Sequence, residues 1–176
     1  GTMTDSGYPR LIKRWQRGQP LADALTVFEV ETGDVGVDVL VDRTPGYERT
    51  VFIRQLDFYR SRQWLARGNK LLPIAKPDDA SVHFWRDLVL FELRSDWPLH
   101  GTLHPKGSLL VGNAAQHLRG QGRLLPLFTP TPARSLAGIT ATRSHLLLNV
   151  LDNVASRLQE RWRCDGKWLS RDVDAP

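Results

Sequence analysis

The chain has 176 residues, of which 41% are hydrophobic and 24% are charged, and this balance excludes an intrinsically disordered protein. Its length allows one domain with a sizeable core and is short for two ordinary domains. The formal net charge of +5 raises the possibility of nucleic acid as a partner, but the basic residues are spread along the chain without a dense run, so we expect no such partner.

A single cysteine, Cys164, excludes an intrachain disulfide and a cysteine-based zinc site, and it favours a reducing, cytoplasmic compartment. No segment approaches the roughly 18 consecutive apolar residues of a membrane-spanning helix, and the N-terminus lacks a signal-peptide pattern, so we expect no membrane partner. We expect residues 1–3 to be a cloning remnant with the start methionine, and residues 4–176 to form one domain.

Strand patterns dominate the first part of the chain. Residues 25–30 and 35–41 are rich in β-branched side chains, and turn-forming residues 32–34 separate them. Within residues 35–41 every second residue is valine, which is the period-two pattern of a strand with one buried face. A turn is predicted at residues 44–46, and the strand pattern resumes at residues 51–53.

A hairpin is predicted next. Strand patterns at residues 63–65 and 71–74 flank a loop at residues 67–70. The loop contains Gly68 and Asn69, which tolerate positive φ at little cost. We therefore expect the two strands to pair with each other.

Residues 81–93 and 138–151 share one layout, in which a strand, a polar turn and an apolar strand follow one another. Leu88 and Leu146 occupy the same place in this layout, and their separation is close to the roughly 50-residue period of longer propeller repeats. The repeat favours a strand at residues 155–162, although good helix formers occur there.

Helix is predicted only at residues 114–118, as about one turn. Turn-rich loops such as residues 129–132 recur at the spacing of an all-β sandwich or propeller. We therefore predict an all-β protein of four-stranded antiparallel units with almost no helix.

No catalytic serine is predicted. A Ser-His-Asp hydrolase on an α/β scaffold exposes its nucleophile at a Gly-x-Ser-x-Gly turn, and this pattern is absent. Ser108 follows Gly107 but lacks the second glycine and leads into a strand, so we interpret it as a turn residue. The chain also lacks the alternating βα units on which such a hydrolase is built.

No metal site is predicted from the histidines. His100 and His104 have the spacing that would place two imidazoles on one helical face. Pro98, Gly101 and Pro105 argue against a helix there, and no third ligand is evident, so we expect a solvated hairpin tip. The remaining histidines stand singly among strand and loop patterns and are interpreted as structural or exposed: His83, His117 and His145.

The carboxylates and glycines do not form a recognisable site either. Asp78 and Asp79 follow a proline, where aspartate side chains accept backbone hydrogen bonds in turns. Residues 120–122 are too short for a phosphate-binding loop. Asp152, Asp172 and Asp174 could supply paired carboxylates for acid–base chemistry, but a structural role is favoured for them. We predict no catalytic, cofactor-binding or metal-binding residue.

Tryptophan and arginine together could stack bases in a nucleic-acid site, but large aromatic side chains in blade-like sheets more often fill the space between neighbouring sheets. We therefore expect the six tryptophans and three further aromatic residues to serve in packing: Trp15, Trp64, Trp85, Trp97, Trp162, Trp168, Phe58, Tyr59 and Phe91.

Several short segments point to a known family. The segment 76–97 contains Asp-Asp-Ala at residues 78–80 and Arg-Ser-Asp-Trp at residues 94–97, and Leu-Asn-Val-Leu-Asp follows at residues 148–152. Together with Ser135-Leu136, these short segments make the chain resemble the β-propeller region of bacterial prolyl oligopeptidase family serine peptidases. The resemblance runs from about Asp34 to about Arg161 and covers a minority of a full-length member.

The resemblance implies a propeller of four-stranded blades that caps an α/β-hydrolase domain and admits only short peptides to a buried Ser-Asp-His triad, which cleaves after proline. No triad residue has a counterpart here, so no catalytic role is carried over. The chain would form about three blades, and their open edges predict self-association, limited by charged edge residues such as Arg60 and Arg62. The alternative is a stand-alone β-rich binding module, which the length of the native reading frame would distinguish.

Overall fold

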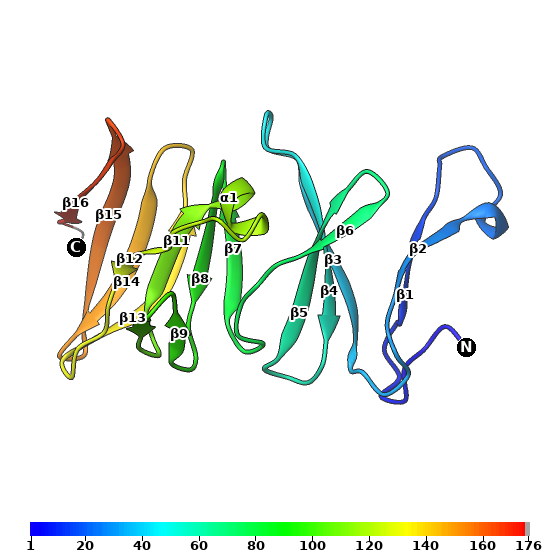
Figure 1. Ribbon diagram of the computed structural model, residues 1–176, viewed down its shortest axis with the longest axis horizontal. Coiled ribbons are helices and arrows are strands. Elements are labelled where there is room, and N and C mark those ends of the chain that lie inside the picture. The colour runs from blue at the N-terminus through cyan, green and yellow to red at the C-terminus, as the bar shows by residue number, and fades with distance from the viewer. Residues whose placement is uncertain (175–176) are drawn as a thin grey trace. The chain divides into compact units, whose positions relative to one another are not determined.

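A computed structural model describes residues 1–174 of this protein (Figure 1). Within that range the chain is almost entirely β, with one α-helix, α1 (Ala114–Leu118), and a 3-10 turn at Leu21–Asp23. The helix lies where the sequence predicts it, and the 3-10 turn was not predicted. The chain divides into two compact units: the first contains Gly1–Asp79 and Ala115–Gly122, and the second contains Ala80–Ala114 and Arg123–Pro176.

A four-stranded antiparallel sheet forms the centre of the first unit. Each strand pairs with the next one in the sequence, in the order β3 (Gly36–Asp42), β4 (Arg49–Gln55), β5 (Ser61–Arg67) and β6 (Lys70–Pro73). The predicted hairpin is confirmed, because Arg67 pairs with Lys70 and Gly68 has a φ of 59° in the turn. Arg60 and Arg62 do not lie on an edge strand as expected: Arg60 lies in the turn before β5, and Arg62 lies in β5, an inner strand of the sheet, where it pairs with Arg54 of β4.

A smaller sheet in the first unit pairs β1 (Leu11–Arg14) with β2 (Leu25–Glu29). The two predicted strands at residues 25–30 and 35–41 are therefore both present, but they belong to different sheets. Aromatic side chains join these sheets: the ring of Phe28 stacks on Phe52 at 4.9 Å between centroids, and the ring of Trp64 lies 5.5 Å from Phe28. This is the packing role predicted for the aromatic residues. The same prediction is wrong for Trp15, Phe58 and Tyr59, which are 47%, 89% and 73% exposed because they lie in turns and loops that the sheets do not cover.

The second unit holds two four-stranded antiparallel sheets. One has the order β12–β11–β8–β7 and the other the order β13–β14–β15–β16. The strands of the first are β7 (Ser81–Trp85), β8 (Leu88–Glu92), β11 (Leu109–Asn113) and β12 (Leu125–Phe128). Those of the second are β13 (Arg134–Ala141), β14 (Leu146–Asp152), β15 (Ala155–Cys164) and β16 (Lys167–Val173).

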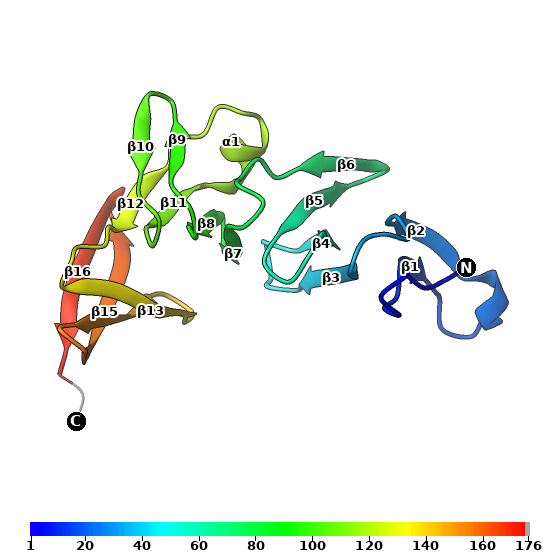
Figure 2. The same cartoon turned by 90° about the horizontal axis from the view of Figure 1, so that it is seen from below.

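An additional hairpin interrupts the first of these sheets. Strands β9 (Trp97–Leu99) and β10 (Thr102–His104) lie between β8 and β11 in the sequence and pair only with each other. Figure 2 shows this hairpin standing apart from β8 and β11. The ring of Trp97 meets Phe91 edge to face at 5.6 Å, which ties the base of the hairpin to the sheet.

The two sheets of the second unit pack face to face through one hydrophobic core. Leu88 in β8 and Leu146 in β14 lie in this core, and each is in the second strand of its sheet, so the predicted repeat is confirmed. Trp85 and Trp168 add an aromatic contact at 6.2 Å. The buried core residues are Trp85, Leu88, Leu90, Leu109, Val111, Leu127, Phe128, Leu146, Leu148 and Val150.

Strand β15 shows why the repeat pattern is a better guide than helix propensity here. Its residues pair with β14 on one side and β16 on the other. Backbone hydrogen bonding along both edges outweighs the small helix preference of residues such as Arg157 and Gln159.

The turn between β14 and β15 carries an unfavourable residue. Asn153 and Val154 have φ values of 47° and 65°, and this left-handed conformation is costly for a β-branched side chain. The side chain of Val154 is 93% exposed, so its loss removes little packing. We expect Val154→Gly to raise the free energy of unfolding by about 1 kcal/mol, measured by urea denaturation. The control Val154→Ala keeps the left-handed cost and should give no such gain; an equal gain from alanine would contradict the explanation.

Candidate functional site

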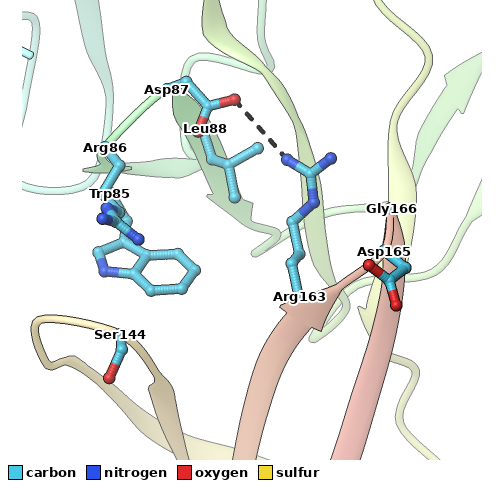
Figure 3. A pocket seen from close by; sticks show the side chains of 8 residues that line it. All are labelled: Trp85, Arg86, Asp87, Leu88, Ser144, Arg163, Asp165 and Gly166. Atoms are coloured by element: carbon cyan, nitrogen blue, oxygen red, sulfur yellow. Dashed lines mark ion pairs between the residues drawn. The ribbon is translucent and has the colours of Figure 1, made fainter.

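A polar groove lies in the second unit where three turns of its two sheets meet (Figure 3). Its volume is about 230 Å³, smaller than the roughly 300 Å³ of the smallest usual ligand pockets. It is lined by Trp85, Arg86, Asp87, Leu88, Ser144, Arg163, Asp165 and Gly166. The groove can therefore hold a side chain or a small polar group.

Two tight hairpin turns build the rim of the groove. Trp85 pairs with Leu88 across the turn at Arg86, whose φ is 56°. The turn between β15 and β16 contains Asp165 and Gly166, with φ values of 49° and 76°. An Asp-Gly pair suits such a turn, because glycine adopts positive φ without steric cost.

Hydrogen bonds hold the groove residues in place. The indole Nε1 of Trp85 donates to the carbonyl oxygen of Thr142 at 2.9 Å. Asn113 donates from Nδ2 to Oδ2 of Asp87 at 3.2 Å, and Nη1 of Arg163 lies 3.7 Å from the same oxygen. The side chains of Arg163 and Asp87 are 43% and 48% exposed, so their attraction is weakened by water. The groove therefore presents positively and negatively charged side chains for binding, and it contains no activated nucleophile.

A Ser-His-Glu arrangement next to the groove was missed by sequence reasoning. Ser144 Oγ lies 2.9 Å from Nδ1 of His145, and Oε1 of Glu160 lies 3.8 Å from that same nitrogen. A catalytic triad uses the two ring nitrogens separately, one for the serine and one for the carboxylate. Figure 3 also shows the Ser144 hydroxyl directed away from Trp85. We conclude that this arrangement stabilises a turn; the adjacent Ser-His pair in the sequence was its only signal.

Ser108 is placed in a setting unlike that of a nucleophile. Ser108 is 1% exposed, and its Oγ has no hydrogen-bond partner. Its backbone N–H donates to Pro105 at 3.1 Å and its carbonyl accepts from Leu93 at 2.9 Å. The hydroxyl therefore has neither a base nor access to solvent.

The histidines are dispersed. His100 sits at the tip of the β9–β10 hairpin, while His104 is buried, so the expected solvated tip holds only for His100. His83 lies 3.9 Å from Glu92. Over residues 1–174, no group of three or more His, Cys, Asp or Glu side chains is arranged to hold a metal ion.

Two polar side chains, the buried His117 and the half-buried Lys76, stabilise the first unit. Nε2 of His117 lies 2.7 Å from the carbonyl oxygen of Ala75, so this nitrogen carries the hydrogen. Burial lowers the pKa of His117, and the hydrogen bond to Ala75 acts in the opposite direction. Lys76 donates from Nζ to the carbonyl oxygens of Ser61, Pro77 and Asp78 at 2.8, 3.0 and 3.1 Å. Burial lowers the pKa of Lys76 to about 8, against the attraction of nearby carboxylates.

The candidate carboxylates are held separately. Asp78 lies 3.3 Å from Arg62, in the turn that the sequence predicts. Asp152 lies 3.7 Å from Arg134, and Asp172 accepts from Gln159 at 2.9 Å. None of these contacts brings two carboxyl groups together for acid–base chemistry.

The glycine-rich segment at residues 120–122 closes the end of α1. Gly120 donates from its backbone N–H to His117 at 2.9 Å, and a Cβ at Gly122 would lie 2.7 Å from the backbone nitrogen of His117. The glycine at position 122 is thus explained by close packing. Cys164 is an exposed free thiol. No helix in the described part of the chain is long and apolar enough to span a membrane.

Comparison with known proteins finds relatives among peptidases, although no family model matches the chain. An uncharacterized peptidase of Sinorhizobium fredii is 29% identical over 192 residues, covering 100% of this chain and 26% of that protein. An uncharacterized peptidase of Rickettsia prowazekii is 28% identical over 166 residues, covering 89% of this chain and 23% of that protein. The chain thus spans about a quarter of the length of these relatives.

Solved structures agree with the fold. A post-proline cleaving enzyme from Rickettsia typhi matches with a TM-score of 0.90 and 26% identity, over 99% of this chain and 27% of that one. A solved prolyl endopeptidase structure matches with a TM-score of 0.64 and 15% identity, over 94% of this chain and 23% of that one, which bears on the fold alone. The predicted fold, four-stranded antiparallel blades of a partial β-propeller, is confirmed.

Proposed function

From its resemblance to part of the β-propeller of prolyl oligopeptidase family peptidases, we propose that this chain is a non-catalytic propeller segment of a serine peptidase, here called the parent. The match to a post-proline cleaving enzyme over 99% of this chain and 27% of that enzyme carries the proposal. In this proposal the parent hydrolyses short proline-containing peptides, and the propeller restricts access to its active site. The segment supplies a scaffold, since neither Ser108 nor Ser144 is placed for catalysis.

The proposed partners follow from this assignment. The segment adjoins an α/β-hydrolase catalytic domain in the parent and meets peptides only on their way to that domain. The parent is cytoplasmic and needs no nucleic-acid or membrane partner. The dispersed basic residues support the absence of a nucleic-acid partner, because several of them form ion pairs within the chain. Examples are Arg54 with Asp34 at 2.9 Å and Arg171 with Glu160 at 2.6 Å.

We expect the isolated chain to show no turnover of a proline-containing chromogenic peptide. Ser108 has no base, and Ser144 and Glu160 approach the same nitrogen of His145, which does not make a catalytic triad. The parent should cleave the same peptide, and a series of longer peptides should be cleaved progressively less well. Ser108→Ala in the parent is the control and should leave turnover unchanged. Turnover by the isolated chain, or a parent indifferent to proline and to peptide length, would disprove the proposal.

The isolated chain is also expected to self-associate. In β14 the residues Leu147 and Leu151 alternate with the core residues Leu146, Leu148 and Val150, so they lie on the other face of the sheet. Trp162 lies on that face as well, with Arg171 5.9 Å above its ring. Light scattering across a dilution series should show a concentration-dependent dimer; a monomer at every concentration would show that this face tolerates water.

A further inference from the structure

The turn between β4 and β5 presents two adjacent aromatic side chains to solvent. Phe58 is 89% exposed and Tyr59 is 73% exposed. Aromatic side chains bury more area than most when they bind, and adjacent exposed rings are uncommon in a protein surface that has no partner. This turn is therefore the strongest unexplained apolar feature of the first unit.

Hydrogen bonds fix the conformation of this turn, and that conformation exposes the rings of Phe58 and Tyr59 to solvent. One carboxylate oxygen of Asp57 accepts hydrogen bonds from the backbone N–H groups of Tyr59 and Arg60 at 2.8 and 2.7 Å. Its other oxygen accepts from Nε of Arg60 at 2.6 Å. The backbone N–H of Leu56 also donates to the carbonyl of Arg60 at 2.9 Å. A pre-formed turn loses little conformational entropy when its side chains are bound.

The chemistry of the turn selects an apolar partner. Asp57 and Arg60 neutralise each other, so the tip bears no net charge and offers nothing to attract a polyanion. The two rings project as neighbouring anchors of the kind that fill pockets at the centre of an interface.

The same topological position is apolar in the second unit. Its turn between the second and third strands of sheet β13–β16 carries Val154, which is 93% exposed. In the hairpin inserted between β8 and β11, Leu103 is 61% exposed. The turns between the third and fourth strands of sheets β3–β6 and β13–β16, at the opposite ends of the strands, carry Gly68-Asn69 and Asp165-Gly166 instead. Elsewhere in the first unit, Leu21 in the loop between β1 and β2 is 76% exposed.

Within each unit, the sheets pack on each other through residues outside these turns. In the first unit the sheets meet through Phe28 and Phe52, and in the second they meet through the core that contains Leu148. The exposed side chains of Phe58 and Tyr59 therefore remain available to contact another part of the protein. The chain spans about a quarter of its relatives, so three quarters of such a protein remain to cover it.

We propose that Phe58 and Tyr59 anchor this segment to the catalytic domain of the parent, by inserting into an apolar pocket on that domain. This inference rests on the proposed function and adds the residues that carry the contact between the two parts. Docking through a rigid turn would fix the position of the propeller over the active site.

Hydroxyl-radical labelling followed by mass spectrometry tests the contact without relying on turnover. Phe58 and Tyr59 should be labelled several-fold more slowly in the parent than in this chain alone, and Leu71, which is 41% exposed on β6, serves as a reference side chain. In the parent, the double variant Phe58→Ser/Tyr59→Ser should increase proteolytic cleavage between the two domains, whereas Leu71→Ser should not.

Equal labelling of both rings in the parent and in this chain would overturn the proposal. Protection that appears in this chain alone and grows with its concentration would assign the turn to a second copy and would also overturn it. A parent that protects the rings but cleaves no proline-containing peptide would leave the contact established and disprove only the proposed activity.

Discussion

Replacing Leu148 with alanine should lower the free energy of unfolding of the second unit by about 3 kcal/mol. Leu148 is fully buried in the core between the two sheets of that unit, and it lies in β14, which is paired on both sides. Removing its branched side chain loses the transfer free energy of the removed methyl and methylene groups. It also leaves a cavity that paired strands cannot collapse to fill.

Urea denaturation followed by tryptophan fluorescence measures this loss, since Trp85 and Trp168 border the same core. Leu169→Ala is the matched control, because Leu169 is 41% exposed on β16, and its effect should stay within about 0.5 kcal/mol. Comparable losses from the two variants would show that the sheets are not held together by this core.

The second large effect is expected at Lys76. Its ammonium group donates to three backbone carbonyls, from Ser61 at the start of β5 and from Pro77 and Asp78 in the following turn. Lys76→Met keeps the hydrocarbon stem but leaves these acceptors without their donor. We expect a loss of about 2 kcal/mol in the free energy of unfolding, which is typical of removing one partner from part-buried, charge-assisted hydrogen bonds.

The control for this variant is Lys70→Met, since Lys70 is exposed at the β5–β6 hairpin in the same unit. Chemical denaturation of both variants separates loss of the three hydrogen bonds from loss of charge alone. If Lys70→Met destabilised the protein as much as Lys76→Met, general electrostatics would be the cause and the carbonyl contacts would be unimportant.

The parts of the fold that depend on neighbouring residues could be predicted from the sequence. The β5–β6 hairpin follows from Gly68 and Asn69, and the strands that begin at Leu88 and Leu146 follow from apolar runs directly after a polar turn. Periodicity does not say which strands pair when they are distant. For that reason a hairpin tip could be predicted at His100, but the pairing of β8 with β11 across that hairpin and the separate sheet of β1 with β2 were not foreseen.

The candidate site was harder to predict because distant turns create it. Trp85 and Asp165 line one groove although they lie in different sheets, and no short motif encodes that meeting. The absence of a nucleophile elbow could be read directly, because that motif is local. The exposure of Phe58 and Tyr59 could not, since a hydrophobic residue in a turn gives no indication of whether the fold covers it.

The interrupted sheet of the second unit has a consequence for how the chain acquires its structure. In sheets β3–β6 and β13–β16 every strand pairs with its sequence neighbour, whereas β8 pairs with β11 across residues 93–108. Closing the longer segment costs more entropy and is slower. During synthesis, one edge of β8 therefore stays unpaired until β11 has been made. Strand β8 contains the apolar run Leu88-Val89-Leu90-Phe91. This run is the part of the nascent chain that we expect chaperones to bind.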